Sequence, residues 1–385
     1  MLLTKLKNYC LVRIEHFTPP WFAAVMGIGI SASILYTFPF QAHWLRVLGV
    51  ILWGFAMGAF GIFATALVLR VILFPRQATS LMLYPGHSVF LGCIPMGFAT
   101  LINMVHNIWG KQAWKATYTM WWIDVFMSLF CAWGVVFVMF LTQKRTQETL
   151  NPTILLPVVA LVVASATGSL IAEVQPSTLQ PSSLIVSLLL LANGEFLAFA
   201  FCVAFINRLL VANLPDRTLT ISLFLQVGPL GQGTFSILNA TLLAADILTG
   251  LGVAADTINT LKYLGILIGF GLMGFASFWM VMAFMALIVR YPSKFSLGWW
   301  GLTFPIGTYV LGWYKLATLT DLYSFKVLGA LFGVLEVLFM ILCFCLSIKS
   351  GILSDAIFIA AGNEITAWST PMVKSDSHSH DTISV

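Results

Sequence analysis

The chain has 385 residues, of which 59% are hydrophobic and only 9% are charged, and this composition excludes a soluble globular protein. The formal net charge of +5 reflects basic residues at the ends of apolar segments and does not indicate nucleic-acid binding. The apolar segments use most of the length, so little remains for a separate soluble domain.

Ten long apolar segments follow one another along the chain, each near or above the ~20 residues that span a bilayer core. They run roughly over 20–38, 44–74, 88–109, 116–142, 152–172, 182–210, 220–248, 258–290, 295–314 and 323–349. Four odd-numbered segments have an internal proline, whereas the five even-numbered segments have none. These prolines are Pro95, Pro157, Pro229 and Pro305. The first segment instead begins at Pro19–Pro20.

This alternation predicts an inner helix flexed by proline followed by a straight outer helix, repeated five times. Irregular backbone at membrane depth is tolerated only where protein buries it or water reaches it. We therefore predict an all-α membrane protein, with ten transmembrane helices arranged as five helical hairpins around a central pore. The four prolines are the expected kinks of the pore-lining helices.

The predicted domains are a cytoplasmic N-terminal segment over 1–19, a transmembrane domain over 20–349 and a polar cytoplasmic tail over 350–385. The first apolar run continues into the array without a small-residue cleavage site, so it is predicted to be a span rather than a removed signal peptide. Loops on the side of the N-terminus each carry two basic residues, whereas the loop 173–182 on the other side carries none. The positive-inside rule then places both termini in the cytoplasm.

Neither cofactor nor metal is expected. The six cysteines form no CxxC pair, the six histidines are scattered, and no Gly-x-x-x-x-Gly-Lys-Ser/Thr loop is present to bind nucleotide. An integral-membrane enzyme would require clustered His, Asp or Glu at a membrane surface, so a protein without enzymatic activity is predicted.

The interiors of the predicted inner segments contain no Asp, Glu, Lys or Arg, and the intramembrane carboxylates lie on even-numbered segments. These carboxylates are Asp124, Glu195 and Glu336. Two interpretations stay open: structural pairing on an outer ring of helices, or proton coupling.

A pathway without fixed charges suits a small anion that must leave again quickly. Hydroxyls, amides and the positive ends of broken helices can replace part of its hydration shell. The candidate pathway residues are Gly29, Ser31, Asn103, His106, Gln226, Gln232 and Thr303. Phe304, directly before Pro305, is either a ring that plugs a narrow pore or ordinary core. His106 is either a residue of the membrane interface or a proton relay.

Two stretches resemble the tellurite-resistance/dicarboxylate transporter family, which has the slow anion channel fold. They are Phe-Thr-Pro-Pro-Trp-Phe-Ala-Ala-Val-Met-Gly-Ile-Gly over 17–29 and Trp-Trp-Gly-Leu-Thr-Phe-Pro over 299–305. The family includes plant guard-cell slow anion channels, fungal malate transporters and fungal sulfite efflux pumps. Residues 29–39 and 87–100 are most similar to the plasma-membrane sulfite efflux pumps. The resemblance covers about residues 16 to 349.

The resemblance implies five helical hairpins in quasi-fivefold arrangement, an anion pore lined by the inner helices, and a homotrimer. It also implies that Phe304 occludes the pore, because this residue matches the phenylalanine of the Trp-Trp-x-x-Thr-Phe-Pro string. One departure is His87-Ser88, where many relatives have His-Pro, so the entrance is expected to differ in shape. Long regulatory domains of the plant type are absent from this sequence, so kinase gating of that kind is not expected.

We therefore expect export of sulfite or bisulfite across the plasma membrane. An inside-negative potential drives a monovalent anion outwards by about 2.3 kcal/mol per 100 mV. A malate or dicarboxylate transporter, or another small-anion channel, is the alternative within the same class, and an integral-membrane enzyme is the alternative outside it. Malate is expected to pass less well than sulfite, because the inner segments offer no paired cations for two carboxylates.

Overall fold

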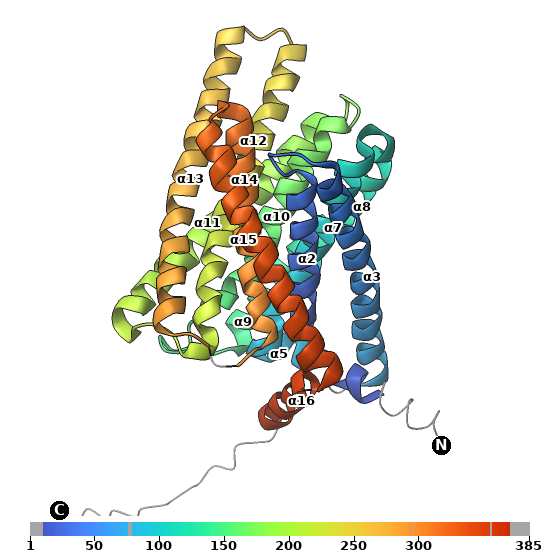
Figure 1. The fold of residues 1–385 in the computed structure, drawn as a ribbon, viewed down its shortest axis with the longest axis vertical. Coiled ribbons are helices and arrows are strands. Elements are labelled where there is room, and N and C mark those ends of the chain that lie inside the picture. Colours follow the sequence, from blue (N-terminus) through green and yellow to red (C-terminus); the bar gives the residue numbers. More distant parts are fainter. Residues whose placement is uncertain (1–10, 76–78, 293, 355, 370–385) are drawn as a thin grey trace, which may run out of the picture.

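The structure is a computed structural model that describes residues 11–75, 79–292, 294–354 and 356–369. Helices make up the fold of these residues, which contain no strand. The long helices are α2 (Phe22–Tyr36), α3 (His43–Leu73), α7 (Cys93–Trp109), α8 (Trp114–Leu129), α10 (Leu156–Ile171), α11 (Gln180–Ala212), α12 (Val227–Gly250), α13 (Ala255–Val289), α14 (Thr303–Thr320), α15 (Tyr323–Ser347) and α16 (Ala356–Ser369). Figure 1 shows them gathered in one bundle, with α16 across one end.

Shorter elements join or extend these helices. The short α-helices are α5 (Ser80–Leu83), α6 (Pro85–Ser88) and α9 (Val136–Thr142). The π-helical segments are η4 (Phe130–Val135) and η9 (Ile348–Leu353). The 3₁₀ segments are η1 (Pro19–Trp21), η2 (Val89–Gly92), η3 (Gly110–Ala113), η5 (Pro152–Leu155), η6 (Ala172–Val174), η7 (Arg217–Gln226) and η8 (Leu297–Leu302).

Eight stretches of the described chain are long and apolar enough to cross a membrane. One of them, Pro85–Thr142, spans 58 residues and contains two long helices, α7 and α8, besides shorter elements. The chain turns between these two at Gly110, whose φ of +48° suits a residue without a side chain. The predicted ninth segment is helical as α14, but it is not among the eight stretches, and its Thr, Tyr and Lys residues reduce its apolar character. The protein is therefore an all-α, multi-pass membrane protein.

Burial separates two kinds of helix. In their most apolar windows, Pro19–Tyr36 is 89% buried and Pro152–Val174 is 94% buried, whereas His43–Leu73 is only 11% buried. The exposed face of His43–Leu73 carries large apolar side chains such as Ile51 and Ile62, which suit contact with lipid. A helix buried on nearly all sides must instead pack against other helices around its whole circumference.

The buried helices close a ring by contact. Helix α2 packs against α7, α7 against α10, α10 against α12, α12 against α14, and α14 against α2. Each of the five also packs against the helix that follows it in the chain. Small residues permit the close approach: a Cβ added to Gly231 of α12 would lie 2.7 Å from the carbonyl carbon of Thr308 in α14.

Every ring helix begins with a 3₁₀ segment: η1 precedes α2, η2 precedes α7, η5 precedes α10, η7 precedes α12 and η8 precedes α14. The four prolines that were predicted to kink the helices lie at the transition from 3₁₀ to α-helix. Pro157 is the second residue of α10, and Pro95, Pro229 and Pro305 are third residues of their helices. The first turn is where a missing N–H disrupts an α-helix least, so the irregularity at each proline is a change of helix type at the start of the α-helix.

Candidate functional site

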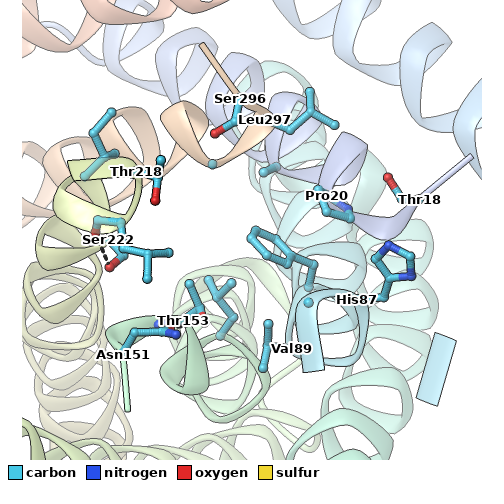
Figure 2. A pocket seen from close by; sticks show the side chains of 18 of the residues that line it. Thr18, Pro20, His87, Val89, Asn151, Thr153, Thr218, Ser222, Ser296 and Leu297 are labelled. Atoms are coloured by element: carbon cyan, nitrogen blue, oxygen red, sulfur yellow. Dashed lines mark hydrogen bonds between the residues drawn. The ribbon is translucent and has the colours of Figure 1, made fainter. Parts of the chain in front are cut away.

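A cavity of about 830 Å³ lies at the end of the bundle where the five 3₁₀ segments begin. We call it the vestibule, and Figure 2 shows its wall. All five segments contribute to that wall, through Pro20, Val89, Thr153, Ser222 and Leu297. The vestibule is therefore coaxial with the ring of helices rather than a groove on its side.

The lining residues recur at every third position of the 3₁₀ segments. In η7 they include Leu219, Ser222 and Leu225, and at η8 they include Gly298 and Gly301. A 3₁₀ helix has three residues per turn, so residues three apart lie above one another. These segments thus turn one face to the vestibule along their length.

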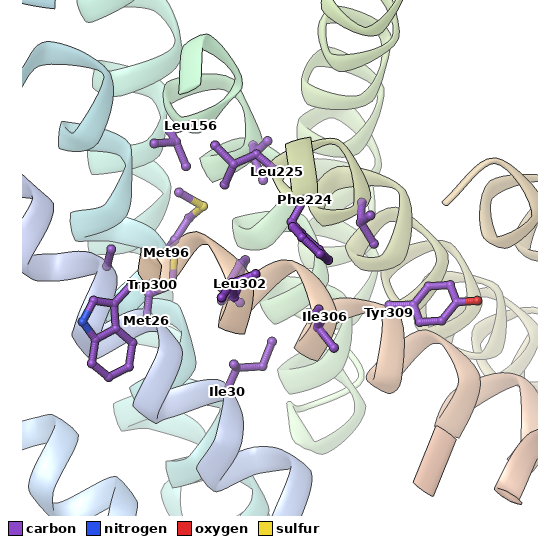
Figure 3. Packing of buried hydrophobic residues seen from close by; sticks show 14 of the residues in the cluster. Met26, Ile30, Met96, Leu156, Phe224, Leu225, Trp300, Leu302, Ile306 and Tyr309 are labelled. Atoms are coloured by element: carbon purple, nitrogen blue, oxygen red, sulfur yellow. The ribbon is translucent and has the colours of Figure 1, made fainter. Parts of the chain in front are cut away.

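In each 3₁₀ segment together with the ring helix that follows it, one residue is the last along the chain to line the vestibule. These residues, which we call the apolar floor, are Met26, Cys93, Leu156, Leu225 and Gly301. The four side chains among them are buried. Figure 3 shows Met26, Leu156 and Leu225 among the packed side chains that continue inwards from this level. A hydrated ion would lose water at the floor without gaining a polar partner.

The next positions inwards differ sharply in size. Phe304 is three residues beyond Gly301 and is 3% exposed, whereas Gly228 is three residues beyond Leu225. Gly228 is buried, yet a Cβ added to it would meet nothing nearer than the Cγ of Pro305 at 4.0 Å. An open space of about one methyl group therefore adjoins α12 at Gly228.

The charge of the vestibule has one sign. Among the described residues that line it are Lys144 and Arg145, and no Asp or Glu. Arg145 is half-buried, and its Nη2 donates a hydrogen bond of 2.9 Å to Oε1 of Gln143. Burial lowers the pKa of the Arg145 guanidinium, but this group stays protonated in proteins. The five helix starts add their positive partial charges. The chemistry of this lining suits anions.

His87 lies in the vestibule wall beside Thr18 and Pro20 (Figure 2). It is 2% exposed, and its Nδ1 has no hydrogen-bond partner among the described residues. The neighbouring Ser88 accepts a 3.0 Å hydrogen bond at Oγ from Nε2 of Gln143. A proline in place of Ser88 would have no side-chain oxygen to accept this bond.

Helix α16 forms part of the vestibule rim. Ile357 and Ala360 are among its lining residues, and Phe358 stacks on Trp21 with ring centroids 5.5 Å apart. The predicted polar tail is thus helical over Ala356–Ser369. Its remainder, 370–385, lies outside the described residues, as do residues 1–10 of the predicted N-terminal segment.

None of the seven predicted pathway residues lines the vestibule, and some of them face other helices. Ser31 donates a 2.7 Å hydrogen bond to Oε1 of Glu336 on α15. Oε1 of Gln226 accepts one of 2.7 Å from the Cys202 thiol of α11. Both side chains therefore connect a ring helix, or the 3₁₀ segment before it, to an outer helix.

Two more of these residues serve helix packing. Gly29 lies against Thr100 of α7, whose Cβ would be 2.7 Å from an added Cβ. Thr303 donates a 2.8 Å hydrogen bond to the carbonyl of Trp300 and lies beside Gly27 of α2. The remaining three keep a buried polar atom without a hydrogen-bond partner in the described chain. They are Asn103 (Oδ1), His106 (Nδ1) and Gln232 (Oε1).

The three intramembrane carboxylates are all buried. Glu336 is held by Ser31, and Glu195 lies against α12, where its Oε2 would be 2.9 Å from a Cβ added to Gly233. Neither oxygen of Asp124 has a hydrogen-bond partner among the described residues. No group of three or more His, Cys, Asp or Glu that could hold a metal occurs in that part of the chain.

Sequence reasoning missed the vestibule and its floor. The predicted pathway residues are polar groups in span interiors, whereas the wall comes from the segments before the α-helices and the floor is apolar. A signal was present: Cys93, Leu156, Leu225 and Gly301 each lie within four residues before an internal proline. Arg145 carried no such signal, because a basic residue in a loop also fits the positive-inside rule.

Comparison with known proteins covers nearly the whole helical array. Residues 16–348 match the family described as voltage-dependent anion channel. The chain is 31% identical to a sulfite efflux pump of Arthroderma benhamiae over 343 residues, which cover 88% of this chain and 91% of that protein. A sulfite efflux pump of Saccharomyces cerevisiae is 26% identical, with 87% and 88% covered. A malic acid transport protein of Schizosaccharomyces pombe is 21% identical, with 89% and 80% covered.

Proposed function

The chain belongs to the voltage-dependent anion channel family, as the sequence resemblance predicted, and we propose that it exports sulfite or bisulfite through a pathway inside the ring of α2, α7, α10, α12 and α14. The observation that carries this proposal is the vestibule, where five helix starts and the side chain of Arg145 surround a cavity whose described lining has no acidic residue. The names of the relatives support sulfite as the cargo. We propose that the protein is a transporter and not an enzyme.

We propose ten transmembrane helices arranged as five hairpins, with α14 as a tenth span beyond the eight apolar stretches. Burial supports this assignment, since Thr303, Thr308 and Tyr309 of α14 lie inside the protein and do not have to face lipid. Assembly as a homotrimer is part of the proposal and rests on the family resemblance alone.

We place the vestibule at the cytoplasmic face of the plasma membrane. Arg70, Lys144 and Arg290 lie at or beyond the helix ends nearest to it, as the positive-inside rule requires of a cytoplasmic side. Arg70 donates a hydrogen bond to the carbonyl of Phe17, just before η1, and Arg290 donates one of 2.9 Å to the carbonyl of Leu214, just before η7. An anion entering here would be driven outwards by the membrane potential.

We propose that Phe304 is the gate. Its position one step beyond the apolar floor, on the ring helix next to the open space at Gly228, supports this role. In the proposed closed state the phenyl ring of Phe304 fills the pathway. A change of the Phe304 rotamer would connect the vestibule to the space beyond. Side-chain rotation leaves the closed ring of helices intact.

The neutral interior favours a compact, singly charged anion. Among the described residues of the five ring helices, the fixed charges are Asp246 and Lys315, both in the half remote from the vestibule. A dicarboxylate would need compensation for two buried charges, and paired cations are missing at this level. The buried donors of Asn103 and Gln232 are the proposed polar contacts along the way.

Flux of labelled sulfite and labelled malate into proteoliposomes tests this proposal, with membrane potential and pH gradient set independently. We expect sulfite and nitrate to be faster than malate, sulfate to be slow, and sulfite flux to follow the potential. Malate flux equal to or faster than sulfite flux would promote the dicarboxylate alternative, which the Schizosaccharomyces pombe relative represents. Sulfite flux that follows the pH gradient and not the potential would indicate proton coupling instead.

A further inference from the structure

We propose that Arg145 forms an anion-loading site in the vestibule, where its guanidinium binds the oxyanion before the ion reaches the apolar floor. This inference rests on the proposed anion transport and adds a specific binding residue to it. The ligand class is a small oxyanion with at least two oxygens in one plane, of which sulfite is an example.

The first support is the way in which Arg145 is held. Its Nη2 donates to Oε1 of Gln143 at 2.9 Å, while Nε2 of Gln143 donates to Oγ of Ser88 at 3.0 Å and to the carbonyl of Leu83 at 3.4 Å. These bonds tie the loop after α9 to the entrance of α7. They fix the guanidinium against the vestibule wall and so reduce the loss of side-chain entropy when an anion binds.

The second support is the set of donors that remains. A guanidinium has five N–H donors, and within the described residues the bond to Gln143 is its one hydrogen bond. Two parallel N–H groups match two oxygens of an oxyanion, which a point charge such as Lys144 does not do. A half-buried position raises the strength of these bonds above their value in water without trapping the ion.

The third support is the charge of the lining. Lys144 also lines the vestibule, and the described lining contains no Asp or Glu. An anion at the guanidinium of Arg145 therefore meets no repelling carboxylate in the described wall.

The test compares Arg145→Gln with Lys144→Gln, since both variants remove one positive charge from the same loop. Initial sulfite flux is measured against sulfite concentration in vesicles sorted so that either the vestibule or the opposite face meets the added sulfite. With the vestibule exposed, we expect Arg145→Gln to raise the half-saturating concentration about tenfold, the usual effect of losing a charged hydrogen bond, with an unchanged maximal rate. Lys144→Gln should raise it less than about twofold.

Two further variants keep the inference testable if Arg145→Gln folds poorly. Arg145→Lys retains the charge but not the planar pair of donors, so its half-saturating concentration should lie between those of wild type and Arg145→Gln. Gln143→Leu leaves Arg145 in place but removes its holder, and its shift should be smaller and not additive with Arg145→Gln. Added sulfite at the opposite face should give the wild-type half-saturating concentration in every variant.

The outcomes separate this inference from the proposed function. Wild-type vesicles that carry no sulfite would defeat the transport proposal itself. If wild type carries sulfite, then equal shifts in Arg145→Gln and Lys144→Gln would mean general electrostatic attraction and overturn the site. A lower maximal rate without any shift, from both faces, would assign Arg145 a purely structural role and also overturn it.

Discussion

Phe304 and Gly228 differ in how tightly they are packed, although each lies three residues after a residue of the apolar floor. Phe304 fills its surroundings, while the space beside Gly228 is open to about the distance of an ordinary van der Waals contact. The pathway proposed here is therefore asymmetric at its narrowest level, with a large ring on α14 and a bare backbone on α12. Two substitutions test this arrangement from its two sides.

Phe304→Ala should raise anion flux, because it removes a ring from the proposed constriction. Phe224→Ala is a matched control: Phe224 is also buried and packs edge-on against Phe284 with ring centroids 5.0 Å apart. The control should lose about 3–5 kcal/mol of unfolding free energy without a gain in flux. Flux and thermal melting of both variants are measured in one preparation. A Phe304→Ala protein that behaves like the control would show that Phe304 is ordinary core.

Gly228→Ala should lower flux and leave stability nearly unchanged, because the new methyl group enters open space. Gly231→Ala, three residues further along the same helix, should instead reduce thermal stability, since its methyl group would lie 2.7 Å from the backbone of Thr308. Thermal melting together with sulfite flux checks both. A strong loss of stability in Gly228→Ala would mean that the space beside Gly228 cannot hold a methyl group.

At the scale of elements, the hydrogen bond between Ser31 and Glu336 links α2 to the outer helix α15. Ser31→Ala should destabilise the protein by about 1–3 kcal/mol, because it leaves a buried carboxyl group without this partner. Glu336→Gln retains an oxygen that can accept the bond, so its stability and its sulfite flux should stay close to wild type. Thermal melting measures the first effect. A Glu336→Gln variant that folds normally but loses flux would support a proton-coupling role for Glu336.

The alternation of proline along the chain distinguished the kinds of helix in four of the five cases. Segments with an internal proline became α7, α10, α12 and α14, whereas α2, the fifth ring helix, has no internal proline and follows Pro19–Pro20. The bounds of α3, α11 and α13 differ from the predicted segments by three residues or fewer. The sequence did not reveal that the segments before the prolines are 3₁₀ rather than α-helical. Both types bury apolar residues at similar spacings, and tertiary contacts at the vestibule decide between them.

The pathway residues were harder to predict, for a physical reason. Polar residues inside spans were chosen for their hydrogen-bonding capacity, but Ser31 and Gln226 use that capacity on Glu336 and Cys202. A buried polar group must be satisfied wherever the nearest partner lies, and single-sequence patterns do not show which helix supplies it. Arg145 lies outside the spans, so a search of span interiors could not find it.

At the scale of the molecule, each ring helix packs against two neighbouring ring helices, so no ring helix can move away without losing contacts on both sides. Opening the pathway by moving a helix would break two of these contacts at once, including the close approach at Gly231. Rotation of one side chain disturbs much less. Crosslinking α2 to α14 through a cysteine pair should therefore leave sulfite flux in Phe304→Ala intact. Abolished flux in the crosslinked protein would indicate that the helices must move.

Three of the outer helices are long for membrane-spanning helices. Helices α3, α11 and α13 have 31, 33 and 35 residues, which at 1.5 Å per residue corresponds to about 47–52 Å against a hydrocarbon core of about 30 Å. Figure 1 shows α13 running along the whole bundle. Such helices fit a thick bilayer with less tilt, and each ångström of mismatch costs a fraction of a kcal/mol. In vesicles of graded acyl-chain length, melting temperature should rise from bilayers about 27 Å thick to those about 33 Å thick. Helix length would then favour residence in the thicker, sterol-rich plasma membrane over the thinner membrane of the endoplasmic reticulum.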